Sequence, residues 1–261
     1  MSAATSSFLR GVTDELRKMR MHLPTFPEAL GSFLRTVVVA LFLLTFILQP
    51  LLIPSESMEE TLLVGDFLLF NKQIYAPAED PGGKVMPYRQ VKRGDIVVFR
   101  HSDPPLLVKR VVGLPGDRLR MRDGRVLIDG VALDEPYAAF EPAAPNASRD
   151  NFPARIYSDP QVDPDWWRQM QSLTRNGELV IPPGEYFVLG DNRNYSLDSR
   201  YWGLVPRQAI IAQPLMIYFS VNRPSSTDPQ PGADDRLGQG RQLFSRLKEL
   251  ARWERIFRVV R

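Results

Sequence analysis

The feature that most constrains this chain is an apolar stretch from 36 to 53 that contains no charged residue. As a helix, about 18 residues rising about 1.5 Å each would extend about 27 Å, which spans a bilayer core if Arg35 extends its charge to the headgroups. A buried core helix would have a similar composition. A cleaved signal peptide is disfavoured, because segment 1–35 is too long for an n-region and no small-x-small site follows. We therefore expect a transmembrane helix over 36–53.

The charges on the two sides of this stretch indicate its orientation. The basic residues before it are Arg10, Arg17, Lys18, Arg20 and Arg35, and the acidic residues after it are Glu56, Glu59, Glu60 and Asp66. The positive-inside rule puts segment 1–35 in the cytoplasm and everything after residue 53 on the outer face. The sequence thus predicts a single-pass protein with the lipid bilayer as a partner.

The composition excludes several kinds of chemistry. The chain has no cysteine, which removes disulfides, cysteine nucleophiles and cysteine-ligated metals. Its two histidines, His22 and His101, lie on opposite sides of the apolar stretch, so a His-based triad would have to use His101. Lysine is the most available base for serine chemistry. We expect no metal and no cofactor, and the central region lacks the interleaved basic and aromatic residues of a nucleic-acid interface.

Short β-branched runs separated by Gly and Pro follow the apolar stretch and predict a mainly antiparallel β domain over 54–223. Strands are expected at 67–72, 95–100, 106–112, 126–128, 185–189 and 210–219. Trp166, Trp167 and Met170 suggest a short helix that packs on the sheet or contacts lipid. Segments 75–89 and 138–164 are expected to be surface excursions.

The C-terminal region divides into a Pro-rich linker, 224–240, and a basic amphipathic segment, 241–261. Apolar residues recur in this segment at roughly helical spacing among seven basic and two acidic residues. Such a segment could lie on anionic lipid. It could also pack on the β domain, and this second reading is slightly favoured.

Lys109 occupies an unusual position for a lysine. In a strand over 106–112, it shares one face with Leu107 and Val111, so its ammonium group would be desolvated. Burial disfavours the charged form and lowers the pKa, which suits a general base. A structural lysine that extends its amine to solvent is the alternative, and the strand alone does not decide between them.

Two other stretches carry hydroxyl and charged side chains. Pro54 to Met58 follows the apolar stretch directly and includes two serines, and Gly190 to Arg200 is too densely polar for a strand. Each stretch by itself is common in proteins, as a turn or a loop. A serine at a membrane exit, however, could act on the flank of another chain's membrane segment.

Taken together, these stretches resemble bacterial type I signal peptidase, the membrane-bound Ser-Lys protease that removes signal peptides from exported pre-proteins. The resemblance rests on Ser-x-Ser-Met at 55–58, on Lys-Arg at 109–110 with Gly-Leu-Pro-Gly-Asp at 113–117, and on Gly-Asp-Asn-Arg at 190–193. Ser-x-Asp-Ser-Arg at 196–200, followed by Tyr-Trp-Gly, completes it. It implies an enzyme of the bacterial inner membrane whose substrates are signal peptides, with a variable insertion at about 118–182.

The resemblance also implies roles for individual residues. Ser57 would be the nucleophile and Lys109 the general base. Ser55 would join the Ser57 N–H in an oxyanion hole, and Ser196 would orient the lysine. The supporting polar residues would be Arg110, Asp191, Asp198 and Arg200. The pocket for the small residue before the cut would be lined by Ile53, Pro54, Met58, Leu62, Leu107 and Val108.

The chain departs from the family pattern at several positions. Asn194 and Tyr195 stand where the family usually has Asp-Asn, and Glu56 replaces the usual Gly between the serines. The disulfide often found in the variable region cannot form.

Self-cleaving Ser-Lys repressors share the fold but carry a DNA-binding module in place of an anchor. A non-catalytic anchored β domain that binds exported chains is the alternative from another functional class.

Overall fold

The computed structural model describes residues 26–42, 47–72, 74–75, 89–101, 106–222 and 250–260. The chain divides into two compact units, Met1–Thr45 and Phe46–Arg261. The described part of the first unit is helix α2, Phe26–Phe42, which has no buried residue. Its large apolar side chains are exposed, with Phe26 81% and Val38 65% accessible.

The apolar stretch does not form the single helix expected over 36–53. Helix α2 ends at Phe42, and Leu48–Leu52 form strand β1, which pairs antiparallel with β2, Asp66–Asn71. Hydropathy alone does not distinguish an apolar helix from an apolar strand, and Pro50 is tolerated because β1 is an edge strand. Among the helices of the described residues, none combines the length and the apolar character needed to cross a membrane.

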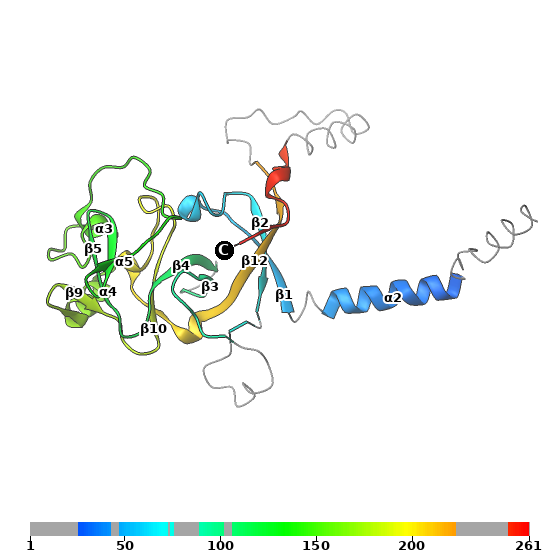
Figure 1. The fold of residues 1–261 in the computed structure, drawn as a ribbon, viewed down its shortest axis with the longest axis horizontal. Coiled ribbons are helices and arrows are strands. Elements are labelled where there is room, and N and C mark those ends of the chain that lie inside the picture. Colours follow the sequence, from blue (N-terminus) through cyan, green and yellow to red (C-terminus); the bar gives the residue numbers. More distant parts are fainter. Residues whose placement is uncertain are drawn as a thin grey trace, which may run out of the picture. The chain divides into compact units, whose positions relative to one another are not determined.

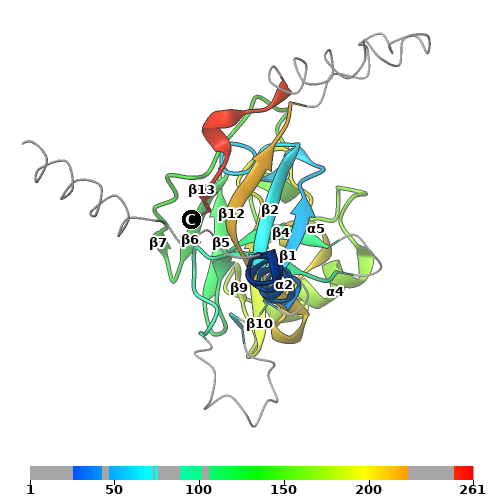
Figure 2. The same cartoon turned by 90° about the vertical axis from the view of Figure 1, so that its right-hand side faces the viewer.

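The main sheet has eight strands in the order β1-β2-β12-β3-β4-β10-β11, with β13 paired to β12 (Figures 1 and 2). The remaining strands are β3 (Ile96–Phe99), β4 (Leu107–Gly113), β10 (Glu185–Leu189), β11 (Val205–Pro206), β12 (Ile210–Ser220) and β13 (Arg258–Val259). All of the paired strands are antiparallel. The long strand β12 joins the sheet by pairing with β3 near its start and with β2 further along. The expected mainly antiparallel β class is confirmed.

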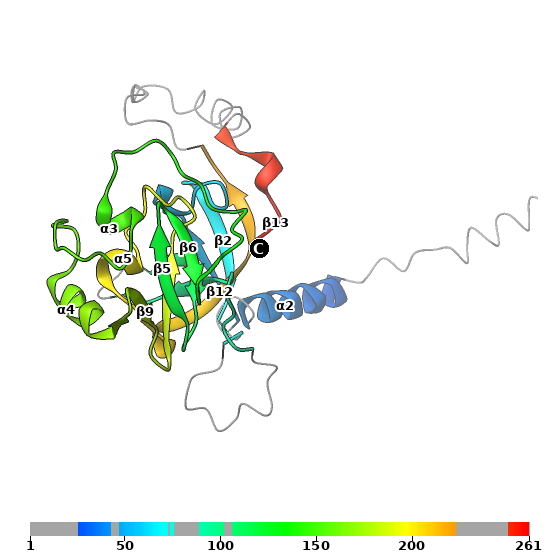
Figure 3. The ribbon, with the colours of Figure 1, turned by 60° about the vertical axis from the view of Figure 1, so that its left-hand side comes forward.

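A second sheet, in the order β7-β6-β5-β9-β8, is built within the expected insertion (Figure 3). Its strands are β5 (Arg118–Arg122), β6 (Arg125–Ile128), β7 (Val131–Ala132), β8 (Thr174–Arg175) and β9 (Glu178–Val180). The helices of this region are α3 (Ala147–Asp150) and α4 (Pro164–Leu173). Helix α4 buries Trp166 and Met170 in a core shared with Phe187 of the main sheet. The predicted packing of this helix on the domain is therefore confirmed.

The described C-terminal residues, 250–260, pack on the main sheet. They form a 3-10 turn, Trp253–Arg255, and strand β13 rather than a continuous amphipathic helix. Arg255 donates hydrogen bonds to both carboxylate oxygens of Asp66, at 3.1 and 2.6 Å, and both residues are buried. The reading in which this segment packs on the β domain thus holds for 250–260. The linker 224–240 and residues 241–249 lie outside the described residues.

Candidate active site

Ser57 lies in a short 3-10 turn, Glu56–Met58, which is separated from the end of strand β1 by three residues. The turn is held at both ends by buried apolar residues, because Ile53 before it and Met58 after it are 3% and 2% exposed. The Met58 carbonyl accepts a hydrogen bond from the Leu62 N–H at 2.7 Å, which folds the following segment into the core. This packing fixes the backbone that carries the Ser57 hydroxyl.

Lys109 comes from strand β4, whose neighbours in the sheet are β3 and β10, and its side chain is 4% exposed. Its Nζ donates a hydrogen bond to Ser57 Oγ at 2.5 Å. Burial lowers the pKa of Lys109 to about 8, although the nearby Asp198 carboxylate opposes this effect. At mildly alkaline pH, much of the amine is therefore neutral and able to accept the Ser57 hydroxyl proton.

The two other hydroxyls of the expected site are placed differently. Ser55 Oγ is exposed and lies 3.4 Å from Ser57 Oγ, so it is close to the reacting centre. Ser196 is 6% exposed, and its Oγ has no hydrogen-bond partner among the described residues. The hydroxyl of Ser196 nevertheless helps to keep the pKa of the Asp198 carboxyl below its ordinary value. No hydrogen bond joins Ser196 to Lys109 in the part of the chain that the structure describes, and the expectation that Ser196 orients the lysine stays a prediction.

Gly190 allows the 190–200 loop to approach the nucleophile. A Cβ at this position would lie 2.3 Å from both the Ser57 carbonyl oxygen and Ser196 Oγ, which is far inside contact distance. Two residues further along the loop, the Asn192 N–H donates a hydrogen bond to the same Ser57 carbonyl oxygen at 3.2 Å. The loop therefore supports the backbone of Ser57, and position 190 requires glycine because the loop passes close to that backbone there.

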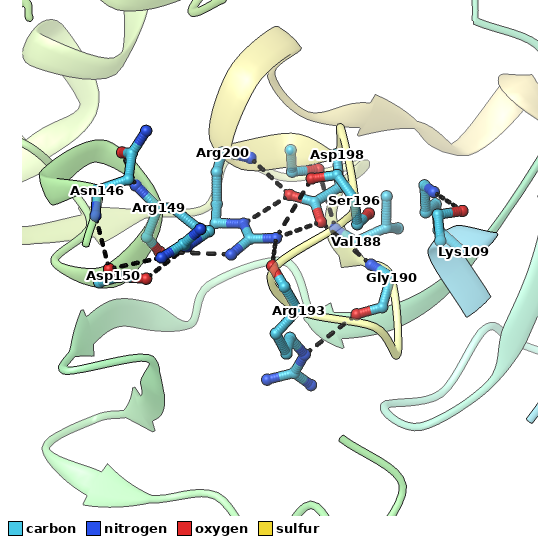
Figure 4. Close-up of polar contacts among 12 residues, drawn as sticks. Lys109, Asn146, Arg149, Asp150, Val188, Gly190, Arg193, Ser196, Asp198 and Arg200 are labelled. Carbon is cyan, nitrogen blue, oxygen red and sulfur yellow. Dashed lines mark hydrogen bonds and ion pairs between the residues drawn. The ribbon is translucent and has the colours of Figure 1, made fainter. Parts of the chain in front are cut away.

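A buried ion pair holds the loop itself (Figure 4). Arg200 donates to both carboxylate oxygens of Asp198 at 2.8 Å, and the Gly190 N–H donates to Asp198 Oδ2 at 3.1 Å. Arg200 also donates to the Arg193 carbonyl at 2.8 Å. Burial raises the pKa of Asp198, but the Arg200 guanidinium outweighs it and keeps the pKa below its ordinary value. Asp198 therefore remains a carboxylate that opposes the loss of charge from Lys109.

Arg110, the neighbour of the lysine on β4, points to the other side of the strand and pairs with Asp191. The guanidinium donates to the two carboxylate oxygens at 2.8 and 2.7 Å and lies 3.9 Å from the centre of the Tyr137 ring. Thr61 Oγ1 donates to the same carboxylate at 2.6 Å. This second buried pair joins β4, the loop and the segment after the nucleophile.

Sequence reasoning did not find Thr61, Glu135 and Tyr137 as parts of this network. Glu135 accepts hydrogen bonds from the Arg193 guanidinium at 2.9 and 2.6 Å and one from the Tyr137 hydroxyl at 3.2 Å. Both Glu135 and Tyr137 come from the insertion, far along the chain from the motifs. Their local sequence carries no signal of this contact, which tertiary folding creates.

A cavity of about 200 Å³ opens beside Ser57 and Lys109. The pocket residues expected from the resemblance that line it are Ile53, Pro54, Met58, Leu107 and Val108, and the structure adds Leu51, Leu52 and Leu106. The expectation that Leu62 lines this pocket is not met. Leu62 is fully buried in the core with Ile53 and Met58 and is not among the lining residues, because the turn after Met58 directs it inward.

The departures from the family pattern have a structural role in this chain. Asn194 Nδ2 donates to the Glu141 carbonyl, and the Tyr195 hydroxyl donates to the Pro142 carbonyl at 3.1 Å. These bonds fasten the insertion to the loop. His101 stacks on Trp202 with 4.1 Å between ring centroids.

Several known proteins are similar to this chain. The family model described as "Signal peptidase, peptidase S26" matches residues 27–219. Signal peptidase I of Pseudomonas fluorescens is 35% identical over 221 residues, covering 77% of this chain and 75% of the relative. Signal peptidase I of Leptolyngbya laminosa is 36% identical over 213 residues, covering 78% and 85%. A crystal structure of a signal peptidase I from Enterococcus faecalis V583 is 31% identical and covers 48% of this chain and 97% of its own, with a TM-score of 0.33.

The match to the family model extends over most of the chain and includes the segments that carry the serine, the lysine and the 190–200 loop. The chain therefore belongs to the signal peptidase family, peptidase S26.

Proposed function

We propose that this protein is a membrane-anchored serine endopeptidase that removes N-terminal signal peptides from exported pre-proteins, with Ser57 and Lys109 as its catalytic dyad. One observation carries the proposal: Lys109 Nζ lies 2.5 Å from Ser57 Oγ in a site where burial lowers the lysine pKa to about 8. A lysine with this pKa can act as a base close to physiological pH.

The reaction would proceed through an acyl-enzyme. Neutral Lys109 takes the Ser57 hydroxyl proton as Oγ attacks the carbonyl carbon before the scissile bond. The resulting oxyanion is stabilised by the Ser55 hydroxyl and the Ser57 N–H. The Lys109 ammonium then protonates the leaving amine as the C–N bond breaks. A water molecule attacks the ester carbon as its proton passes to Lys109; the ester C–O bond then breaks, the Lys109 ammonium returns a proton to Ser57 Oγ, and the signal peptide leaves with a new C-terminal carboxylate.

The pocket supports cleavage after small side chains. Its volume of about 200 Å³ and its mainly aliphatic lining suit alanine or another small residue at the positions one and three before the cut. Lys109 is the one charged side chain among the lining residues, and it is engaged by Ser57. Large or charged side chains at these positions would lack both space and a polar partner.

Membrane attachment fits the exposed apolar surface of α2. Phe33 and Val39 on this helix are 63% and 57% exposed, and the helix has no buried residue that would mark it as a core element. In the proposed arrangement, the segment before α2 is cytoplasmic and the catalytic unit lies on the outer face of the bacterial inner membrane. An enzyme held at the bilayer meets signal peptides at high effective concentration.

The proposal is tested with the purified full chain in detergent micelles and one pre-protein that carries Ala at the positions one and three before the cut. Ser57→Ala and Lys109→Ala should each reduce the cleavage rate by roughly a thousandfold or more, because the two groups act as a unit. Ser172→Ala and Lys92→Ala, at exposed positions, are the matched controls and should cleave normally. A Phe at the position before the cut should block cleavage.

Either of two results would overturn the proposal. If Lys109→Ala retains more than a few per cent of the rate, the lysine is structural. If the wild type binds the pre-protein without cleaving it and fails to react with a penem acylator, the non-catalytic binding function is correct.

A further inference from the structure

The insertion holds a second cavity, of about 630 Å³, that shares no lining residue with the pocket beside Ser57. It is bordered by strand β5, by segment 151–156 and by the 176–177 turn between β8 and β9. Strand β5 and helix α4, which also contributes to the lining, lie in the same part of the catalytic unit (Figure 3). Nothing in the reaction proposed above uses this groove.

The alternation of β5 puts three arginines on one face of the strand. Leu119 and Met121 are buried in the core, so Arg118, Arg120 and Arg122 share the opposite face of the strand. Arg118 is satisfied by an ion pair with Glu178 at 3.0 Å. Arg120 and Arg122 both line the groove instead.

Positive charge in this groove lacks a compensating carboxylate. Arg155 is the third arginine of the lining, and no Asp or Glu is among the lining residues. Arg120 Nε is a buried atom without a hydrogen-bond partner in the described part of the chain. A buried guanidinium donor left unpaired costs free energy, whereas pairing with a carboxylate is strong and can be bidentate. The groove is therefore complementary to an anion.

The remaining lining residues indicate what carries that anion. The amide side chains of Asn151, Gln171 and Asn176 line the groove, and Ile156, which is 75% exposed, offers apolar contact. Asn151 Oδ1 accepts from the Asp123 N–H and Gln171 Nε2 donates to the Ala154 carbonyl, and the remaining amide atoms can hydrogen-bond to peptide groups. A lone phosphate or a lipid headgroup would pair with arginines but would leave the amides and apolar surface unused. An extended peptide uses all three kinds of group.

We propose that this groove binds an extended acidic peptide segment, whose carboxylates pair with Arg120, Arg122 and Arg155 and whose backbone contacts the amide side chains. The site is separate from the catalytic dyad. It gives the insertion a binding function for acidic regions of other exported chains.

The test uses the full chain in detergent micelles with Ser57→Ala, so that binding is measured without cleavage and independently of the peptidase proposal. The probes are a fluorescein-labelled ten-residue Glu/Ala peptide and the same peptide with Gln in place of Glu. The Glu peptide should bind, with affinity that falls as salt rises, and the Gln peptide should bind at least tenfold more weakly.

Arg122→Gln with Arg155→Gln should weaken binding of the Glu peptide by at least tenfold. Both side chains are exposed, so this double variant should fold, and its melting temperature is measured as a check. Arg168→Gln, an exposed arginine on α4 outside the lining, should bind like the parent.

Three outcomes would overturn the proposal. The first is equal binding of the Glu and Gln peptides, and the second is unchanged binding by the double variant. The third is absence of peptide binding while inorganic phosphate or phosphatidylglycerol vesicles bind in a way that depends on the same arginines, which would assign the groove to phosphate groups.

Discussion

Replacement of Lys109 by Met should abolish cleavage and at the same time make the folded protein more stable. The pKa of Lys109 falls from 10.5 to about 8 because the side chain is buried, which means that folding must desolvate an ammonium group. One pKa unit corresponds to about 1.4 kcal/mol, so this penalty is roughly 3 kcal/mol at pH 7. Methionine removes the penalty but loses the hydrogen bond to Ser57, worth about 1 kcal/mol.

The net gain in the free energy of unfolding is therefore about 2 kcal/mol at pH 7, or about 4–8 °C in the melting temperature of a unit of this size. The size of this gain depends on pH. Between about pH 8 and 10.5, the unfolded chain binds more protons at this site than the folded chain. The penalty is complete below this window and disappears as pH rises through it, and the advantage of Lys109→Met should disappear with it.

The assay is thermal unfolding of the wild type, Lys109→Met and Ser57→Ala in the same detergent, followed by tryptophan fluorescence from pH 7 to 10.5. Ser57→Ala is the matched control, because it removes the same hydrogen bond and leaves the buried amine. The reasoning fails if Lys109→Met is no more stable than Ser57→Ala at pH 7. It also fails if the difference between them does not shrink as pH rises.

Three further predictions concern the rate and the fold. The cleavage rate should rise about tenfold from pH 7 to 9 as Lys109 loses its proton, and His101→Ala should keep this profile; a rate already level above pH 7 would contradict it. Gly190→Ala should abolish cleavage in a folded protein, since its Cβ would lie 2.3 Å from a backbone oxygen, while Gly31→Ala, with nothing within 4 Å, should cleave normally. Arg255→Ala should destabilise the fold by about 2 kcal/mol, measured in urea, because it removes the 2.6 Å ion pair of the buried Asp66 carboxylate and leaves Arg252 at 3.6 Å as its cationic partner; unchanged stability would contradict it.

Local patterns predicted much of this protein. The alternation and the β-branched runs indicated strands that the structure contains, such as β2 and β4, because side-chain period and turn residues are encoded within a few positions. The burial of Lys109 followed from its aliphatic neighbours in a strand. The motif spacing, through the resemblance, brought Ser57 and Lys109 together, and the structure places their reactive atoms 2.5 Å apart.

What the local sequence could not decide depended on contacts between distant segments. Leu48–Leu52 became an edge strand because β2 offered its backbone hydrogen bonds, whereas hydropathy alone suggested that the helix continued. Leu62 entered the core because of the turn at Met58, and Glu135 reached Arg193 from an insertion that carries no motif. The sequence by itself predicted most of the strands of the β domain, because side-chain alternation depends on neighbours along the chain, and its motifs named Ser57 and Lys109 as candidates through the resemblance. Only the tertiary structure decided which residues line the pocket and which support the loop, because pairing and burial are properties of segments that meet in space.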